Sequence, residues 1–237
     1  AVLRACHEAN VPVTAAGGRS GVVGGSAPAF GGVVLDLTGM QGILHVDKQS
    51  GLVDVLPGTF GPDLEAELRT QHGLTVGHFP QSFELATVGG WVACRGAGQY
   101  STRYGKIEDM VAGLEVVLPD GSIVRTGGFP ASAQGPDLTH LFLGCEGTLG
   151  VITRLVLRLH PKPRSVCTAM VSVGGYEQVL ALLRIARERL GPTLAAFEAM
   201  WPDFYAFARA QRGSVPMPEN GSIHVLVETM GTDEARD

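Results

Sequence analysis

The sequence predicts an α+β protein. Short strand-like runs follow one another closely through the first two thirds of the chain, and segments of helical period interrupt them. Hydrophobic residues make up 45% of the 237 residues, which is enough for a sizeable core. Glycine accounts for 33 residues, about twice the usual share of ~7%. We therefore expect many turns and many places where one backbone approaches another closely.

Helices and short strands alternate in the first part of the chain. It opens in a helix that stops near Asn10. A second helix is expected over 63–72, because Leu64 and Leu68 lie four residues apart and Gly73 is a typical residue after a helix end. Strands are expected at 33–37, 42–46 and 51–56, and a hairpin at 113–118 and 122–126 around Pro119-Asp120-Gly121.

A stiff break at Pro161-Lys162-Pro163 predicts a domain boundary, which divides the chain into 1–162 and 163–237. The last strand before the break is expected at 151–159. Beyond the break we expect a strand at 166–173, a helix at 176–190 and a strand at 222–228. The opening helix lacks a preceding strand, and the final strand–helix–strand pattern leaves its sheet unclosed. Both features are expected of a piece of a longer chain.

Composition and charge argue against several classes of protein. A formal net charge of −5 without a long basic run disfavours nucleic acid as a partner. No window is apolar for the ~18 residues of a membrane span, and no signal-peptide pattern is present. The four cysteines, like the seven histidines, are scattered, which favours reduced thiols in a cytoplasmic protein without a metal site.

The most informative segment is 14–25, Thr-Ala-Ala-Gly-Gly-Arg-Ser-Gly-Val-Val-Gly-Gly. Successive backbone N–H groups without side chains suit a phosphate or pyrophosphate. The spacing does not match G-x-G-x-x-G ahead of a helix, and no G-K-[ST] follows the glycines. A dinucleotide bound here would need another architecture, and the alternative reading is an ordinary turn region.

Two further segments mix glycine and Thr/Ser with small apolar residues. They span 79–105, which contains Thr-Val-Gly-Gly-Trp and Arg-Tyr-Gly, and 144–153, Gly-Cys-Glu-Gly-Thr-Leu-Gly-Val-Ile-Thr. Each could offer N–H and hydroxyl donors to a polar ligand while letting the backbone pack against a flat ring. The alternative for each is a sheet corner or bulge that requires glycine. Three such segments together weaken that alternative.

In the order and character of these segments the chain resembles the FAD-linked oxidases of the vanillyl-alcohol-oxidase type. The branch it is most similar to contains D-lactate, glycolate and D-2-hydroxyglutarate dehydrogenases, with alkyl-dihydroxyacetonephosphate synthase nearby. The resemblance spans nearly the whole chain. Its specific motifs are Glu-Gly-Thr-Leu-Gly-Val-Ile-Thr, and Thr-Val-Gly-Gly followed by Arg-Tyr-Gly. It implies a two-lobed FAD-binding domain over 1–162, with an N-terminal strand missing, followed by the beginning of a substrate or cap domain.

The same resemblance implies which residues hold FAD, mostly through their backbone. The first loop would cradle the pyrophosphate, and 81–90 would run along the pyrophosphate and ring. Residues 94–97 would continue that wall, and 146–152 would line the ring and the adenine side. Arg19 and Arg95 would add positive charge, or else be solvated surface arginines. Val22 stands where some relatives carry a flavin-attaching histidine, so covalent attachment is not expected there. The cofactor-binding set is Ala16, Gly17, Gly18, Arg19, Ser20, Gly21, Gln81, Ser82, Thr87, Gly89, Gly90, Cys94, Arg95, Ala97, Glu146, Gly147, Gly150, Val151 and Ile152.

The resemblance leaves the reaction open between branches. The ether-lipid synthase carries an arginine for the substrate phosphate near the position of Glu198, and a carboxylate there would repel a phosphate. Gly-Gly-Trp and Ile107-Glu108-Asp109, in contrast, look closer to the synthase. We favour oxidation of a D-2-hydroxy acid, with a flavin transferase acting on a ketone phosphate and a non-catalytic FAD-binding subunit as alternatives. The sequence names no catalytic residue. His78 is expected to be a packed or hydrogen-bonded histidine. The protein is allowed to form a homodimer.

Overall fold

The computed structural model describes residues 1–130, 133, 135–218 and 222–233. The chain forms two compact units. Unit 1 comprises Ala1–Gln99 and Gly105–Lys162, and unit 2 comprises Tyr100–Tyr104 and Pro163–Asp237. The sequence assigned segment 100–104 to the first domain, but it packs with unit 2.

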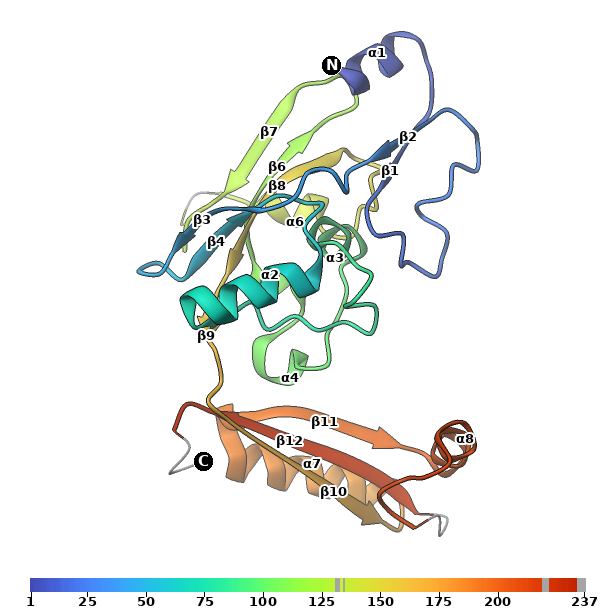
Figure 1. Cartoon of the computed structure of the whole chain (residues 1–237), viewed down its shortest axis with the longest axis vertical. Helices are drawn as coiled ribbons and strands as arrows, with labels where there is room; N and C mark the ends of the chain where they lie inside the picture. The colour runs from blue at the N-terminus through green and yellow to red at the C-terminus, as the bar shows by residue number, and fades with distance from the viewer. Residues whose placement is uncertain (131–132, 134, 219–221, 234–237) are drawn as a thin grey trace. The chain divides into compact units, whose positions relative to one another are not determined.

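The first lobe of unit 1 carries the glycine-rich loop. Its chain runs through α1 (Val2–Glu8), β1 (Val13–Ala16) and β2 (Val33–Asp36). The two strands pair in parallel, so the chain that leaves the end of β1 must run back to the level at which β1 begins before β2 can start. It does so as a long loop (Figure 1). Asn10 follows the end of α1 with a φ of 54°, which agrees with the expected helix stop.

A five-stranded antiparallel sheet forms the second lobe, in the order β3-β4-β8-β6-β7. Val53, Val55, Leu155 and Leu157 are fully buried on one face. The opposite face carries cross-strand ion pairs, Asp54 with Arg154 and Glu115 with Arg125. The strands are β3 (Ile43–Asp47), β4 (Leu52–Val55), β6 (Val111–Val117), β7 (Ile123–Gly127) and β8 (Val151–Arg158).

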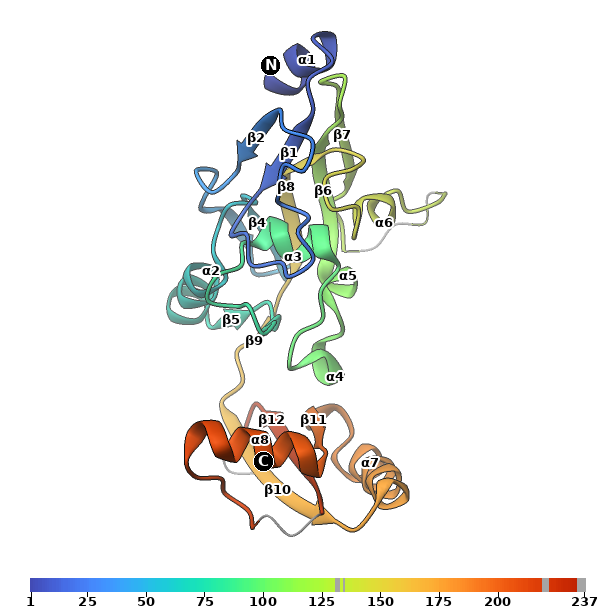
Figure 2. The same cartoon turned by 90° about the vertical axis from the view of Figure 1, so that its right-hand side faces the viewer.

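Short helices and a small strand pair complete unit 1, and α3 lies against β8 (Figure 2). The expected helix over 63–72 begins earlier, at Gly61, and its last turn widens into the π-helix η1 (Leu68–His72) before Gly73 ends it with a φ of 68°. The other elements are α2 (Gly61–Glu67), β5 (Leu74–Thr75), α3 (Val88–Cys94), α5 (Ile107–Met110), α6 (Thr139–Phe142) and β9 (His160–Pro161).

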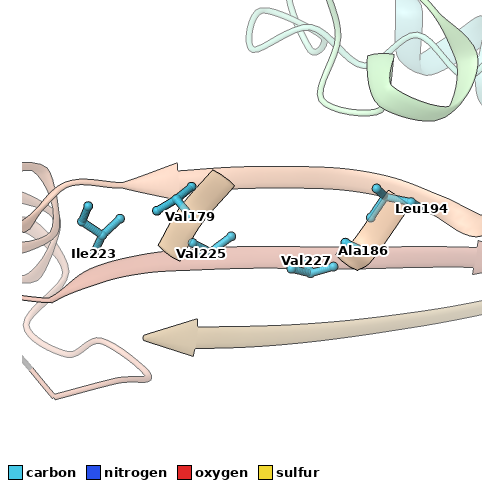
Figure 3. Packing of buried hydrophobic residues seen from close by; sticks show 6 residues of the cluster. All are labelled: Val179, Ala186, Leu194, Ile223, Val225 and Val227. Carbon is cyan, nitrogen blue, oxygen red and sulfur yellow. The ribbon is translucent and has the colours of Figure 1, made fainter. Parts of the chain in front are cut away.

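Unit 2 is a three-stranded antiparallel sheet in the order β10-β12-β11, with α7 against one face. Residues from α7, β11 and β12 form its core: Val179, Ala186, Leu194, Ile223, Val225 and Val227 (Figure 3). Its elements are α4 (Ser101–Tyr104), β10 (Ser165–Val173), α7 (Tyr176–Leu190), η2 (Gly191–Thr193), β11 (Leu194–Met200), α8 (Pro202–Arg212) and β12 (Ile223–Gly231).

The expected strands and helices agree with the structure to within a few residues, and the α+β fold class is confirmed. The 113–126 hairpin is confirmed, with Val117 paired to Ile123. The elements that were not expected from the sequence include α3, α8, β11 and several very short helices and strands. The hydrophobic period is weak in α3 because two of its seven residues are glycines.

Candidate cofactor site

The glycine loop after β1 packs directly on segment 85–87. A Cβ atom placed on Gly17 would lie 2.3 Å from Thr87 Oγ1, and one placed on Gly18 would lie 1.9 Å from the carbonyl oxygen of Leu85. A Cβ on Gly18 would therefore force the backbone to move, and a Cβ on Gly17 would displace the side chain of Thr87. The first two predicted segments therefore touch, and they touch through glycine.

Segment 85–90 is itself fixed by backbone contacts. Gly89 N–H donates to the Pro57 carbonyl at 2.8 Å, and a Cβ on Gly89 would lie 2.7 Å from Pro57 Cβ. Thr87 is buried and caps α3, with its Oγ1 accepting from Gly90 N at 3.4 Å. The Thr-Val-Gly-Gly motif thus begins a helix and presses it against the chain that enters α2.

The third segment lies beside the end of α3. Gly144 N donates to Val92 O and Glu146 N donates to Ala93 O, each at 3.1 Å. Glu146 also reaches the first loop, because a Cβ on Gly25 would lie 2.5 Å from its Oε2. All three glycine-rich segments, distant in the sequence, therefore meet around α3.

Not every predicted cofactor-binding residue lies where the three segments contact one another. Gly150, Val151 and Ile152 are buried, and the last two pair with Val117 and Val116 in the sheet. A Cβ on Gly150 would lie 2.7 Å from Val116 Cγ1, so this glycine serves strand packing. The structure brings together Gly17, Gly18, Thr87, Gly90, Cys94, Arg95, Glu146 and Gly147, while Gln81 and Ala97 are exposed nearby in the chain.

Backbone strain is concentrated in the same place. Among the described residues, four non-glycine residues have positive φ, and three of these are Arg19 (55°), Arg95 (53°) and Glu146 (48°). One lies in each of the three segments. A left-handed conformation costs a non-glycine residue ~1 kcal/mol or more, and such residues gather at functional sites.

Both predicted arginines are paired with carboxylates. Arg19 lies 3.3 Å from Asp36 with more than half of its side chain exposed, and Arg95 lies 3.3 Å from Glu108. Burial raises the pKa of Glu108, but hydrogen bonding and charge from Lys106, with the Arg95 charge, outweigh it and leave that pKa lowered. Arg95 also covers Gly144, where an added Cβ would lie 3.1 Å from its Cβ. Arg95 thus links the second segment to the third.

The thiol of Cys94 lies near the carboxylate of Glu146. Burial raises the pKa of its thiol, and the charge of Glu146 raises it further. The thiol therefore stays protonated near neutral pH, which disfavours its acting as a nucleophile.

His78 lies behind the second segment and is fully buried. Its ring stands edge-on to Trp91 with the centroids 4.9 Å apart, and neither ring nitrogen bonds to a described residue. Burial lowers its pKa to about 4, so the imidazole is neutral at pH 7. The expected packing of His78 is confirmed. Glu65 holds the chain just before it by accepting from Thr75 Oγ1 and Val76 N.

The residues present fit a flavin dinucleotide. The N–H groups of residues 18–23 donate to no described residue, so they remain available to an anion. The exposed Leu85 next to Gly18, with the exposed Val22 and Val23, offers apolar surface for rings. Among described residues no group of three or more His, Cys, Asp or Glu is placed to hold a metal ion.

The sequence missed two glycines that build this site, Gly25 and Gly144. Gly25 contacts Glu146 and Gly144 contacts Arg95, so each contact joins two different segments. Residue spacing within one segment therefore does not predict these contacts. Their signal was the glycine content of the loops themselves.

A parallel strand pair with a glycine-rich loop and a separate antiparallel sheet agree with the two-lobed flavin-binding domain that the resemblance implies. Residues 1–127 match the model of the FAD binding domain family. The chain belongs to this family, and FAD is its cofactor.

The relatives agree with this assignment. The mitochondrial D-2-hydroxyglutarate dehydrogenase of Bos taurus is 36% identical over 240 residues, covering 100% of this chain and 43% of the relative. The D-lactate dehydrogenase of Anaerostipes hadrus is 38% identical over 76% of this chain and 38% of its own. A solved alkyldihydroxyacetonephosphate synthase matches with a TM-score of 0.83 and 27% identity, over 97% of this chain and 44% of that one. The chain thus spans less than half the length of these proteins.

Proposed function

We propose that this chain is part of an FAD-dependent oxidoreductase that oxidises a D-2-hydroxy acid of the lactate, glycolate or 2-hydroxyglutarate type. The observation that carries the proposal is the meeting of three glycine-rich segments around α3. Relatives named for hydroxy-acid oxidation support the substrate class. Bound FAD would supply the acceptor for the hydride of the substrate's α-carbon.

In this proposal the chain's own residues bind and orient the cofactor. The free N–H groups of the first loop face the dianionic pyrophosphate, with no lysine needed. Thr87 and the α3 backbone hold the loop in place, and residues 144–147 form the next wall. Because Arg19 and Arg95 are already paired with carboxylates, their charges assist little.

Flavin spectroscopy tests the proposal on the full-length protein. The purified protein should be yellow, and its flavin absorbance should bleach anaerobically with D-lactate, glycolate or D-2-hydroxyglutarate. A colourless protein that takes up no added FAD would refute it. Bound FAD that no substrate reduces would favour the non-catalytic subunit instead.

The second candidate is a flavin transferase that exchanges an acyl for an alkyl group on a ketone phosphate. The match to the solved synthase favours it. Against it stands Glu198, an exposed carboxylate on β11 that would repel a phosphate. Acyl-dihydroxyacetone phosphate distinguishes the two candidates. A transferase should show a changed flavin spectrum when this compound is added, and it should not oxidise hydroxy acids.

Location and assembly remain parts of the proposal. The scattered cysteines favour the cytoplasm, whereas the bovine relative is named as mitochondrial. Among the described residues, no helix has the length and apolarity to cross a membrane. A homodimer is compatible with the chain, and analytical ultracentrifugation would decide it.

A further inference from the structure

Glu146 lies where the three glycine-rich segments of unit 1 meet. Its N–H donates to Ala93 O at 3.1 Å, which joins its backbone to α3. A Cβ on Gly25 would lie 2.5 Å from its Oε2, so the carboxylate reaches the first loop. Burial and the charge of Glu146 together raise the pKa of the Cys94 thiol, so the carboxylate also lies near the second segment. The side chain of Glu146 is therefore close to both of the other segments.

The carboxylate of Glu146 forms no hydrogen bond or ion pair with any described residue. Two other carboxylates near the site differ in this respect, because Asp36 pairs with Arg19 and Glu108 pairs with Arg95. Glu146 is also an exposed residue. Both of its carboxylate oxygens therefore remain available to a bound molecule.

Glu146 holds this position in an unfavourable backbone conformation. Its φ is 48°, in the left-handed region, and the following Gly147 has a φ of 81°. Glycine at position 146 would adopt the same turn without this cost, and the Glu146 carboxylate makes no described bond that offsets it. Strain of this kind gathers at ligand-binding sites. The strain and the free carboxylate both indicate that the side chain meets a ligand.

The neighbouring loop limits which part of FAD this carboxylate binds. The free N–H groups of residues 18–23 suit the pyrophosphate, and Gly25 follows them directly in the chain. A carboxylate repels a phosphate group but accepts strong hydrogen bonds from hydroxyl groups. In FAD the pyrophosphate joins the ribityl chain to the ribose of adenosine, so hydroxyl groups flank it on both sides. A carboxylate beside a pyrophosphate loop therefore has hydroxyl groups as its natural donors.

We propose that the carboxylate of Glu146 accepts a hydrogen bond from a hydroxyl group of FAD, on the ribityl chain or on the ribose. This contact adds a side-chain anchor to a site that otherwise offers backbone N–H groups. Gly25 belongs to the same subsite, because a larger residue there would push the carboxylate away. The inference concerns the cofactor, and it holds whichever substrate the flavin oxidises.

Glu146→Gly tests the proposal because it should move two quantities in opposite directions. Urea unfolding of the full-length protein, after FAD is removed, should show a higher midpoint, since the positive φ no longer carries a side chain. FAD affinity, measured by the flavin fluorescence released on dilution of the holoprotein, should fall about 10-fold or more, because a hydrogen bond to a charged group is lost. FAD affinity that is unchanged or higher overturns the proposal, and a higher affinity would mean that Glu146 repels the phosphates.

A second variant and a matched control accompany this measurement. Glu146→Gln keeps the size and an acceptor oxygen without the charge, so its FAD affinity should fall by a smaller factor, about fivefold. Asn10→Gly is the control, because Asn10 has a similar φ of 54° after α1 and lies outside the three segments. It should raise the urea midpoint and leave FAD affinity unchanged. An equal loss of affinity in Asn10→Gly would overturn the assignment of the effect to the Glu146 carboxylate.

The two halves of FAD identify which hydroxyl group is bound. FMN carries the ribityl chain and ADP carries the ribose, and calorimetry measures the binding of each to the FAD-free protein. Weaker FMN binding by Glu146→Gly assigns the contact to the ribityl chain, and weaker ADP binding assigns it to the ribose. Unchanged binding of both halves overturns the proposal, because every hydroxyl group of FAD is present on one of them.

The failure of this inference is distinguishable from the failure of the proposed function. Wild-type FAD affinity in both Glu146 variants overturns the role of Glu146, while hydroxy-acid oxidation stands. A full-length protein that takes up no FAD overturns both. A protein that needs Glu146 for FAD but oxidises no hydroxy acid overturns the proposed function alone.

Discussion

The two units use opposite means to present polar groups. In unit 1 the candidate cofactor site consists of backbone, where glycines such as Gly17 and Gly18 remove side chains so that N–H groups stand free. In unit 2 the polar face consists of side chains on the regular strand β12. His224 and Glu228 lie four residues apart on this strand and therefore point to the same face. Unit 1 should therefore be sensitive to added atoms, and unit 2 to changed functional groups.

The sharpest way to break this comparison is a single added methyl group in unit 1. Gly18→Ala places a Cβ 1.9 Å from Leu85 O, so the loop must move away from segment 85–87. We expect flavin affinity to fall by about 5- to 150-fold, because a strain of about 1–3 kcal/mol falls on the binding loop itself. Gly39→Ala is the matched control, since nothing lies within 4 Å of its added Cβ and it lies outside the three glycine-rich segments. Flavin absorbance per protein measures both, and equal retention would contradict the backbone model.

Acid should weaken unit 1 through His78. Its pKa of about 4 in the folded protein lies below the ordinary 6.5. Between these values the unfolded chain binds a proton that the folded chain excludes. The stability is therefore complete above pH 6.5 and falls by about 3 kcal/mol as the pH drops to 4.

His78→Phe should remove that loss, which urea unfolding from pH 7 to pH 4 measures. His45→Gln, at an exposed position of β3, should keep the wild-type pH dependence. An unchanged acid slope in His78→Phe would mean that another group carries it.

A core substitution in unit 2 sharpens the comparison from the other side. Val225→Ala removes two methyl groups from a fully buried site and should cost about 2 kcal/mol. Hydrogen exchange should speed up in β10, β11 and β12 while flavin binding by unit 1 stays intact. Flavin loss in this variant would show that the cofactor site depends on unit 2.

The smallest expected effect comes from the strained Arg95. Arg95→Ala and Arg95→Gly both lose the ion pair with Glu108, but only glycine relieves the φ of 53°. The glycine variant should be more stable than the alanine variant by about 1 kcal/mol in urea unfolding. Equal stability would mean that the left-handed turn relaxes when the side chain is removed.

Sequence reasoning succeeded where the signal is local. The 176–190 helix, the hairpin around Pro119-Asp120-Gly121 and the helix end at Gly73 each depend on neighbouring residues, and each is confirmed. The glycine-rich segments stood out for the same reason, although their contacts with FAD stay a prediction.

What the sequence missed depends on distant partners. Helix α3 depends on Gly89, which packs on Pro57, a residue 32 positions earlier in the chain. The buried Oε1 of Glu228 has no hydrogen-bond partner among the described residues, which follows from its placement between Thr168 and Ala196, and only the strand order reveals that placement. No periodicity within either segment carries that information.

Helix α4 has a consequence for how the protein is made. Arg103 bonds to carbonyl groups that follow it by 89 and 127 residues. A ribosome builds the chain from its N-terminus, so this short helix leaves the exit tunnel long before its partners exist. Unit 2 therefore cannot be completed until β12 has been translated, and premature release at any earlier codon leaves α4 without the strands that hold it.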